Sequence, residues 1–306
     1  MLINIAAEQE GITVYTLTRR LGISRRNLIR LKNTAGGIQV NGSPVTVRCV
    51  LHTGDTVYLA IEDGEDGTVG NILPGENLPR VLWESEQLIA YDKPPGMPTH
   101  PSHGHMTDSL GSAACKLWQE RGEPFVFRPV NRLDRDTSGV VLTAKTQHAA
   151  WAMSRRLQAG AFSKKYIAVL DGTLEQPEGE IVSWIVRKTD SVIERVVTVE
   201  GKESDYALTR YRTFKAEGGR AIVEASPITG RTHQLRVHFA WKGVPILGDD
   251  LYGRPSEEIA RQALHAYSLT FPNPFDGERE VNVTSPIPDD MRRVSEYLRN
   301  FNPLRF

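Results

Sequence analysis

The sequence is poor in cysteine and has no long apolar run. Its 306 residues include only two cysteines, Cys49 and Cys115. This number excludes a disulfide scaffold and a four-cysteine zinc site, and it is typical of a protein of the reducing cytoplasm. No window approaches about 18 consecutive apolar residues, so no membrane-spanning helix is expected. Residues 1–11 contain two acids and no basic segment, and no secretory signal peptide is expected.

Acidic residues are absent from residues 11–50. Over the whole chain 37 basic and 37 acidic residues cancel, but residues 1–50 carry seven basic residues and two acids, a net charge of +5. A basic pole on a neutral protein is a candidate contact for a polyanion, although a solvated helix face is the commoner explanation of such a run. Four of the cations belong to one predicted helix: Arg25, Arg26, Arg30 and Lys32.

Residues 1–62 are expected to form a small α+β domain. A helical turn ends at Gly22, and Ser24 is a good N-cap for a helix whose inward residues would be Leu28, Leu31 and Ala35. Short strands and the Asn41-Gly42 hairpin turn follow. Residues 63–79 are rich in Gly, Pro and acids, which is typical of a linker. Residues 80–306 would then form the second domain.

The second domain alternates strand-like and helix-like segments. We expect strands over residues 88–92, 139–144, 165–170, 209–213 and 221–224, and a helix over residues 148–157. Short turns separate several of the strands. We therefore predict an α+β fold with a mixed, mainly antiparallel central sheet and flanking helices.

Two polar motifs stand out. The first, Asn131-Arg132-Leu133-Asp134-Arg135-Asp136-Thr137-Ser138-Gly139, precedes an apolar strand, and its glycine allows a close backbone approach. This pattern suits an active-site loop and equally a structural turn. The second is Thr229-Gly230-Arg231-Thr232-His233-Gln234-Leu235-Arg236-Val237-His238-Phe239. Here Thr232 is expected to cap a helix with Leu235 and Phe239 facing inward, which leaves two arginines for an anion or a structural ion pair.

Together the two motifs resemble the RluA-type family of pseudouridine synthases. The resemblance extends through Lys93-Pro94-Pro95-Gly96-Met97, Lys164-Lys165-Tyr166 and the segment 243–253, and it covers about residues 79–291. Residues 24–55 resemble the S4 RNA-binding domain that is often fused to these enzymes. The resemblance implies an isomerase that breaks the N1–C1′ bond of a uridine in RNA and rejoins the base through C5. Such a reaction needs no co-substrate, and no cofactor is expected.

The resemblance also implies roles for individual residues. The catalytic aspartate of the family maps to Asp134, which can attack C1′ as a nucleophile or take a proton from C2′ as a base. The family arginine that pairs with this aspartate maps to Arg236, with Arg231 as the alternative. Tyr166 matches the tyrosine that stacks on the target base and can handle a proton. Asp136 is assigned a structural role.

Further positions are expected to bind substrate or to differ from the family. Arg132 is expected to contact RNA or help to flip the base, and Arg231 is expected to bind substrate. Many family members have His where this chain has Asn131, and Asn cannot titrate. The histidines at positions 100, 103 and 105 are read as a polar loop, because no Cys or Glu among them completes a zinc site.

Two other classes of function stay open at this point. The chain could be an RNA-binding or ribosome-assembly protein whose synthase fold has lost catalysis. It could also be a hydrolase that uses Asp134 and Asp136 as an acid–base pair. If it is a synthase, ribosomal RNA of the large subunit is favoured over transfer RNA as the partner. A cytoplasmic location is expected, with no membrane contact and no obligate protein partner.

Overall fold

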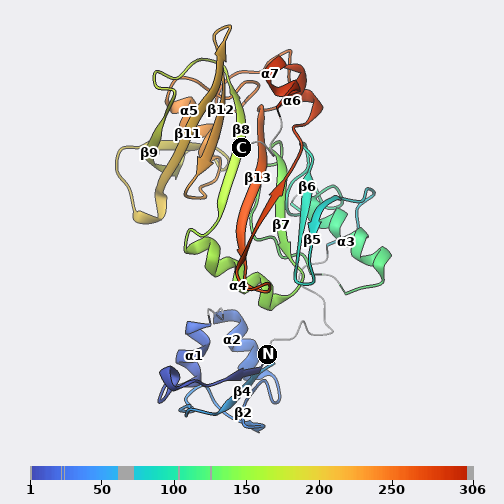
Figure 1. Ribbon diagram of the computed structural model, residues 1–306, viewed down its shortest axis with the longest axis vertical. Helices are drawn as coiled ribbons and strands as arrows, with labels where there is room; N and C mark the ends of the chain where they lie inside the picture. The colour runs from blue at the N-terminus through green and yellow to red at the C-terminus, as the bar shows by residue number, and fades with distance from the viewer. Residues whose placement is uncertain are drawn as a thin grey trace.

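The computed structural model describes residues 2–21, 23, 25–60, 72–102, 104–124 and 126–301 of the chain, and the side chains of residues 20 and 25–27 are outside this description. Its strands belong to two separate sheets, one of four strands and one of ten. Figure 1 shows the two sheets and the helices that accompany each of them.

The four-stranded sheet is built from the first 59 residues. Its order is β1-β4-β2-β3, and all its pairs are antiparallel. The elements are β1 (Leu2–Asn4), η1 (Ala7–Gln9), α1 (Val14–Arg20), α2 (Arg25–Asn33), β2 (Ile38–Val40), β3 (Ser43–Pro44) and β4 (Thr56–Leu59). Leu28 and Leu31 are buried as predicted. Ala35 is exposed, since the helix ends at Asn33, and strand β1 was not predicted. The limits of the two domains and the likeness to S4 stay predictions.

The ten-stranded sheet has the order β10-β9-β11-β12-β8-β13-β7-β6-β5, with β14 paired to β13. Its strands are β5 (Arg80–Glu84), β6 (Leu88–Lys93), β7 (Ser138–Ala144), β8 (Ser163–Leu170), β9 (Glu178–Arg187), β10 (Arg195–Thr198), β11 (Tyr206–Glu217), β12 (Arg220–Pro227), β13 (Leu264–Asn273) and β14 (Arg279–Thr284). Only β13 and β7 are parallel among the described strands. The predicted α+β class with a mixed, mainly antiparallel sheet is confirmed.

Helices flank this sheet. They are α3 (Leu110–Arg121), α4 (Gln147–Gln158), α5 (Gln234–Trp241), α6 (Asp289–Arg293) and α7 (Glu296–Arg299), with a short η2 (Glu203–Asp205). Helix α5 packs on strands β9 to β12, and α4 contacts β7 (Figure 1). No helix in the described ranges is both long and apolar enough to cross a membrane.

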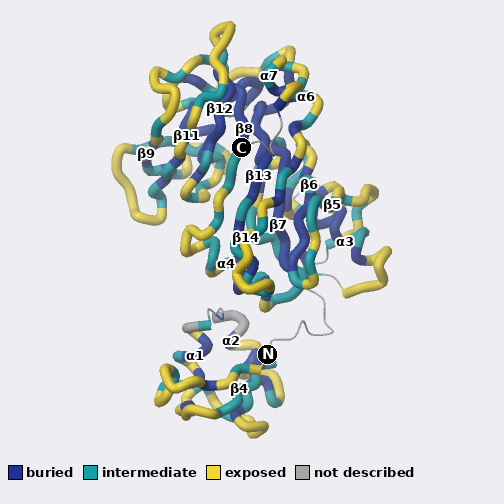
Figure 2. Tube along the Cα trace, in the orientation of Figure 1, coloured by how far each residue is buried: buried dark blue, intermediate teal, exposed yellow. Residues whose placement is uncertain are grey.

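The core of the large sheet is continuous along its middle strands. All seven residues of β7 are buried, because the strand is covered on both faces and its apolar residues run without alternation. Figure 2 shows this buried band through β6, β7, β13, β8 and β12. The band brings the loop before β7, strand β8 and the segment between β12 and α5 to one region. The two polar motifs therefore meet in space.

Glycine 139 permits the close parallel contact between β7 and β13. Its φ is +120°, and a Cβ at this position would lie 2.1 Å from the carbonyl oxygen of Ala266. A side chain would therefore push the two strands apart. The predicted close backbone approach at this glycine is confirmed.

Candidate active site

A pocket of about 500 Å³ opens where the two motifs meet. Its walls come from the loop before β7, the first half of β8 and the segment between β12 and α5. Among the described lining residues Asp134 is the only acid, and the basic residues are Arg132, Lys164, Arg231 and Arg236. Such a set of charges fits a polyanionic ligand and one carboxylate that does chemistry.

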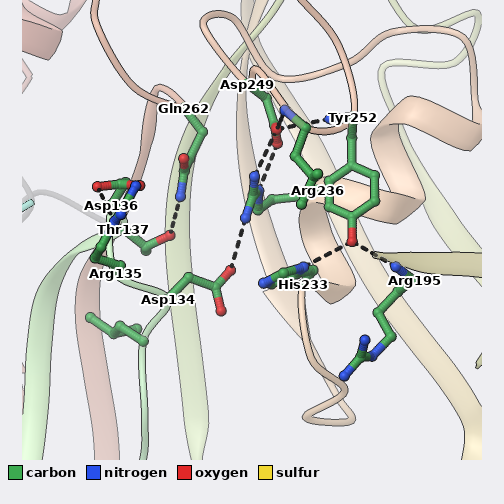
Figure 3. A network of polar contacts seen from close by, with 12 residues as sticks. Asp134, Arg135, Asp136, Thr137, Arg195, His233, Arg236, Asp249, Tyr252 and Gln262 are labelled. Carbon is green, nitrogen blue, oxygen red and sulfur yellow. Dashed lines mark hydrogen bonds and ion pairs between the residues drawn. The ribbon is translucent and has the colours of Figure 1, made fainter. Parts of the chain in front are cut away.

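Asp134 lies in a tight turn that directs its side chain into the pocket. The backbone N–H of Thr137 donates to the carbonyl of Asp134 at 3.1 Å, and Gln262 Nε2 donates to Thr137 Oγ1 at 3.2 Å (Figure 3). The side chain of Asp134 is 28 % exposed. This carboxylate can therefore meet a ligand and is still held by a rigid turn.

The residues just before Asp134 are pinned on both sides. Thr99 Oγ1 donates to the carbonyl of Leu133 at 2.9 Å and accepts from its N–H at 3.2 Å. Asn131 Nδ2 donates to the Val140 carbonyl at 3.1 Å, and its Oδ1 accepts from the Leu142 N–H at 2.8 Å. The asparagine thus replaces two backbone hydrogen bonds along the edge of β7. This is a structural use of the amide that needs no titration.

Lys93 also holds the loop that carries Asp134. Its ammonium group is fully buried and donates to three carbonyl oxygens, those of Pro94, Met97 and Arg135, at 2.7–2.9 Å. Burial lowers the pKa of Lys93 to about 7, although the charges of Asp136 and Asp134 counteract this. The residue ties the turn after β6 to the Asp134 loop. Lys93 lies in one of the segments that resemble the family, but its sequence context predicted no role for it.

Arg236 has a different main partner from the one predicted. Its Nε and Nη2 donate to the two carboxylate oxygens of Asp249 at 2.7 and 2.8 Å, whereas its Nη1 is 3.9 Å from Asp134 Oδ2. Burial opposes the charge, but the hydrogen bonds and charge of Asp249 and the charge of Asp134 raise the pKa of Arg236. The predicted pairing with Asp134 is therefore only a second, longer contact. A bidentate bond to Asp249 fixes the guanidinium, and its free edge faces Asp134 (Figure 3).

Asp249 completes this arrangement although sequence reasoning gave it no role. It is fully buried, and its Oδ1 also accepts from the backbone N–H groups of Leu251 and Tyr252, both at 3.1 Å. The ring of Tyr252 lies under Arg236, with the guanidinium carbon 5.1 Å from the ring centroid. The only signal in the sequence was the Gly248-Asp249 pair followed by Tyr252-Gly253 within the family resemblance.

Tyr166 lines the pocket from strand β8. Only 9 % of its surface is exposed. Its hydroxyl makes no hydrogen bond with the part of the chain that the structure describes. Burial, and to a lesser extent the charge of Asp134, raises its pKa well above the usual value. The phenol therefore keeps its proton at neutral pH and is suited to stacking against a base or donating a hydrogen bond.

The other predicted substrate contacts differ in their freedom. Arg231 Nε donates to the Tyr206 carbonyl at 2.9 Å, so this arginine is held at the pocket wall and is not paired with Asp134. Arg132 is exposed, and neither it nor Lys164 forms an ion pair with a described acid. Burial lowers the pKa of Lys164. Arg132 and Lys164 are therefore available to bind a phosphate or a base of the RNA.

Two local expectations in the motifs have clear outcomes. Thr232 was expected to cap α5, but the N-cap position is occupied by His233 in the left-handed conformation, with φ of 58°. Leu235 and Phe239 are buried as predicted.

The carboxylate of Asp136 accepts from Arg135 at 2.8–3.2 Å and does not line the pocket. An acid–base pair of Asp134 and Asp136 across one substrate bond is therefore not formed.

The histidine-rich loop shows no metal-like geometry in its described part. No group of three or more His, Cys, Asp or Glu side chains there, or elsewhere in the described ranges, could hold a metal ion. His105 pairs with Asp108 at 2.7 Å, and the ring of His100 packs edge-on against Phe127. Residue 103 is not among the described residues. That catalysis needs no cofactor stays a prediction.

The basic residues of the first domain are only partly described. Arg30 and Lys32 are exposed on α2, and neither forms an ion pair with an acid in the described ranges. The side chains of Arg25 and Arg26 are outside the described residues. The proposed RNA contacts at these four positions stay predictions.

Comparisons with known proteins agree with the site. Residues 87–241 match the family model described as RNA pseudouridylate synthase. A Bacillus subtilis protein named uncharacterized RNA pseudouridine synthase YjbO is 36% identical over 92% of this chain and 98% of its own length. Ribosomal large subunit pseudouridine synthase C of Escherichia coli O157:H7 is 29% identical over 98% of this chain and 97% of its own.

A further relative and a solved structure support the same assignment. Ribosomal large subunit pseudouridine synthase D of Nitrosomonas europaea is 34% identical over 72% of this chain and 65% of its own length. The structure of human RNA pseudouridylate synthase domain containing 4 has a TM-score of 0.58 and 27% identity, over 72% of this chain and 93% of that one. The chain therefore belongs to the RluA-type family of RNA pseudouridine synthases.

Proposed function

We propose that this pseudouridine synthase acts on ribosomal RNA of the large subunit, with Asp134 as its catalytic carboxylate. The observation that carries the assignment of Asp134 is its place as the only described acid of a pocket that also holds Arg236 and Tyr166. Two relatives that align with most of this chain are named ribosomal large subunit pseudouridine synthases, and this supports the proposed substrate. A cytoplasmic location and the absence of an obligate protein partner stay predictions.

Each group in the pocket has a task in this reaction. The carboxylate of Asp134 either attacks C1′ or removes the proton at C2′, and both steps need the ionised form. Arg236, fixed by Asp249, holds a positive charge 3.9 Å from that carboxylate. Tyr166 offers its face to the flipped uracil. Arg132, Lys164 and Arg231 surround the opening with positive charge for the phosphates.

The substrate is tested by deleting the gene and mapping pseudouridine in all stable RNAs by mass spectrometry. We expect sites in large-subunit ribosomal RNA to become uridine, and to return with the wild-type gene but not with one encoding Asp134→Asn. Loss of sites from transfer RNA alone would overturn the proposed substrate. If the pseudouridine map does not change after deletion, the alternative of an RNA-binding protein without catalysis is favoured.

The two arginines of the second motif should respond differently to the same conservative change. Arg236→Lys keeps the charge but loses the planar two-pronged bond to Asp249, and turnover should fall by about tenfold or more. Arg231→Lys loses the guanidinium hydrogen bonds to two backbone carbonyls, at 2.9 and 3.5 Å, and should cost about threefold or less. Tritium release from C5 of labelled uridine in RNA, measured in a single turnover, gives both rates. A larger loss for Arg231→Lys would show that the motif arginines are wrongly assigned.

The basic helix should bind RNA through phosphates. Replacing Arg25, Arg26, Arg30 and Lys32 by Gln in the full chain should weaken RNA binding and flatten its salt dependence. Each lost phosphate contact removes about 0.7–0.9 from the log–log slope. Turnover at saturating RNA should change much less, because Asp134, Tyr166 and Arg236 all lie outside the four-stranded sheet and its helices.

The measurement is RNA affinity at several salt concentrations for wild type and variant. A control variant replaces the exposed Lys215 of β11 by Gln, and its slope should equal that of wild type. If the fourfold variant also keeps the wild-type slope, the basic run is only a solvated helix face.

A further inference from the structure

His233 takes part in a hydrogen-bond chain that the reaction described above does not use. The backbone N–H of Arg195 donates to the Tyr252 hydroxyl at 2.9 Å, and that hydroxyl is 2.8 Å from His233 Nδ1. The two rings also pack edge to face, with centroids 5.6 Å apart. The chain runs from strand β10 through the loop after Asp249 to the wall of the pocket (Figure 3).

The protonation of the chain follows from its geometry. Burial raises the pKa of Tyr252, so this phenol keeps its proton. The Tyr252 oxygen already accepts from Arg195, and within the described residues the hydroxyl proton has only His233 Nδ1 as an acceptor. Burial lowers the pKa of His233, more than the nearby charge of Asp134 raises it, so the ring is neutral. In a neutral ring whose Nδ1 accepts, the proton is on Nε2.

The backbone around His233 aims the ring into the pocket. Its left-handed φ of 58° costs a residue with a side chain some free energy, and neighbouring hydrogen bonds hold it there. The carbonyl of His233 accepts from the Val237 N–H at 2.9 Å, and Gln234 Oε1 accepts from the Arg231 N–H at 3.0 Å. Figure 3 shows the ring nitrogen that does not bond Tyr252 turned to the side of Asp134.

We propose that His233 donates its Nε2–H to a carbonyl oxygen of the target uracil while the N1–C1′ bond breaks, and that Tyr252 is the positioning residue that fixes this tautomer. The inference rests on the proposed function of the pocket. The electron pair of the broken bond stays on the uracil, so negative charge develops over N1, O2 and O4. A new C5–C1′ bond then forms as the bond between C1′ and Asp134 breaks or, if Asp134 acted as a base, as it returns the proton to C2′. The proton at C5 passes to water, and N1 takes a proton from water. His233 itself neither gains nor loses a proton in this account.

A neutral donor suits this place better than a cation. An imidazolium beside Asp134 would compete with Arg236 for the carboxylate, and it could protonate the departing base before the ring has turned. A fixed neutral N–H lowers the energy of the charged uracil at no cost of reorganisation, as donors in other oxyanion sites do. The tyrosine prevents the ring from switching to the other tautomer.

The kinetic arm uses total RNA from the gene-deletion strain, labelled with [5-³H]uridine, and an excess of full-length enzyme. We expect His233→Ala to slow single-turnover tritium release by about 10²-fold, the usual cost of one such donor, with RNA affinity unchanged. His233→Gln should recover at least about tenfold of that loss, because the Gln amide also offers an N–H at the position of Nε2. His148→Ala, an exposed histidine on α4, is the matched control and should leave the rate unchanged.

The second arm observes the tautomer itself. In enzyme labelled with ¹⁵N-histidine, long-range ¹H–¹⁵N spectra should show His233 protonated on Nε2, and Tyr252→Phe should lose this preference. A proton on Nδ1 in wild type, a full rate in His233→Ala, or no recovery in a folded His233→Gln would each overturn the proposal. Separating the RNAs after reaction shows which class released tritium. A wrong substrate is thus distinguished from a wrong role for His233.

Discussion

Asp134→Asn should reduce pseudouridine formation by about 10⁴-fold, near the upper range for loss of a catalytic acid or base. The amide has almost the shape of the carboxylate, but it is neither a nucleophile nor a base. The fold should survive, because the contact with Arg236 spans 3.9 Å at a partly exposed side chain and Arg236 keeps its bidentate bond to Asp249. The unfolding free energy should therefore change by less than about 1 kcal/mol.

The neighbouring Asp136 provides the matched control. Asp136→Asn removes a carboxylate two residues away that bonds Arg135 and does not line the pocket. Its single-turnover rate should stay within about tenfold of wild type. RNA affinity of both variants should match wild type. If Asp136→Asn abolished turnover and Asp134→Asn kept a rate near that of wild type, the catalytic carboxylate would be Asp136.

Asp249→Asn should cause the largest loss of stability, about 3–5 kcal/mol of unfolding free energy. The carboxylate is fully buried, and it compensates the charge of Arg236, whose side chain is only 8 % exposed. An amide removes the close, bidentate counter-charge of this guanidinium and leaves only the 3.9 Å contact with Asp134, and it also weakens the acceptor for two backbone N–H groups. Denaturant unfolding followed by circular dichroism measures the change, and turnover should fall as well because Arg236 is no longer fixed.

The next residue in the chain is the control for this prediction. Asp250 is exposed, and Asp250→Asn should change stability by less than about 0.5 kcal/mol. The double variant Arg236→Met with Asp249→Asn should be more stable than Asp249→Asn alone, since it no longer buries an uncompensated charge. Equal unfolding midpoints for Asp249→Asn and Asp250→Asn would contradict the role given to the buried pair.

Sequence reasoning found the elements that have strong local patterns. The apolar run of β7, the helix α4 and the inward pair Leu235 and Phe239 all appear as predicted, because burial on both faces or at helical spacing leaves a clear periodicity. Strand β1 escaped notice because three residues are too few to show a period. Ala35 was expected on the inward face of α2, but the helix ends two residues earlier, at Asn33.

The sequence motifs predicted only part of the site. They indicated Asp134, Tyr166 and Arg236, and the structure brings all three to one pocket. The partners that hold them are chosen by tertiary packing. Nothing local to Arg236 indicates that Asp249 will be its main partner, and nothing near Lys93 shows that its ammonium will reach the carbonyl of Arg135, 42 residues further on. Likewise, the left-handed turn at His233 follows from bonds that neighbouring residues make after folding.

The parallel contact of β7 with β13 has a consequence for how the enzyme is made. All the proposed catalytic residues precede residue 237, yet the turn that carries Asp134 is held by partners from residues 261–266: Arg261 donates to the Asp136 carbonyl at 3.1 Å, and Gln262 to Thr137. A ribosome must therefore synthesise most of the chain before the loop gains its final shape. We therefore expect a growing polypeptide that already contains every reactive group to stay inactive until β13 has left the exit tunnel and paired with β7 and β8.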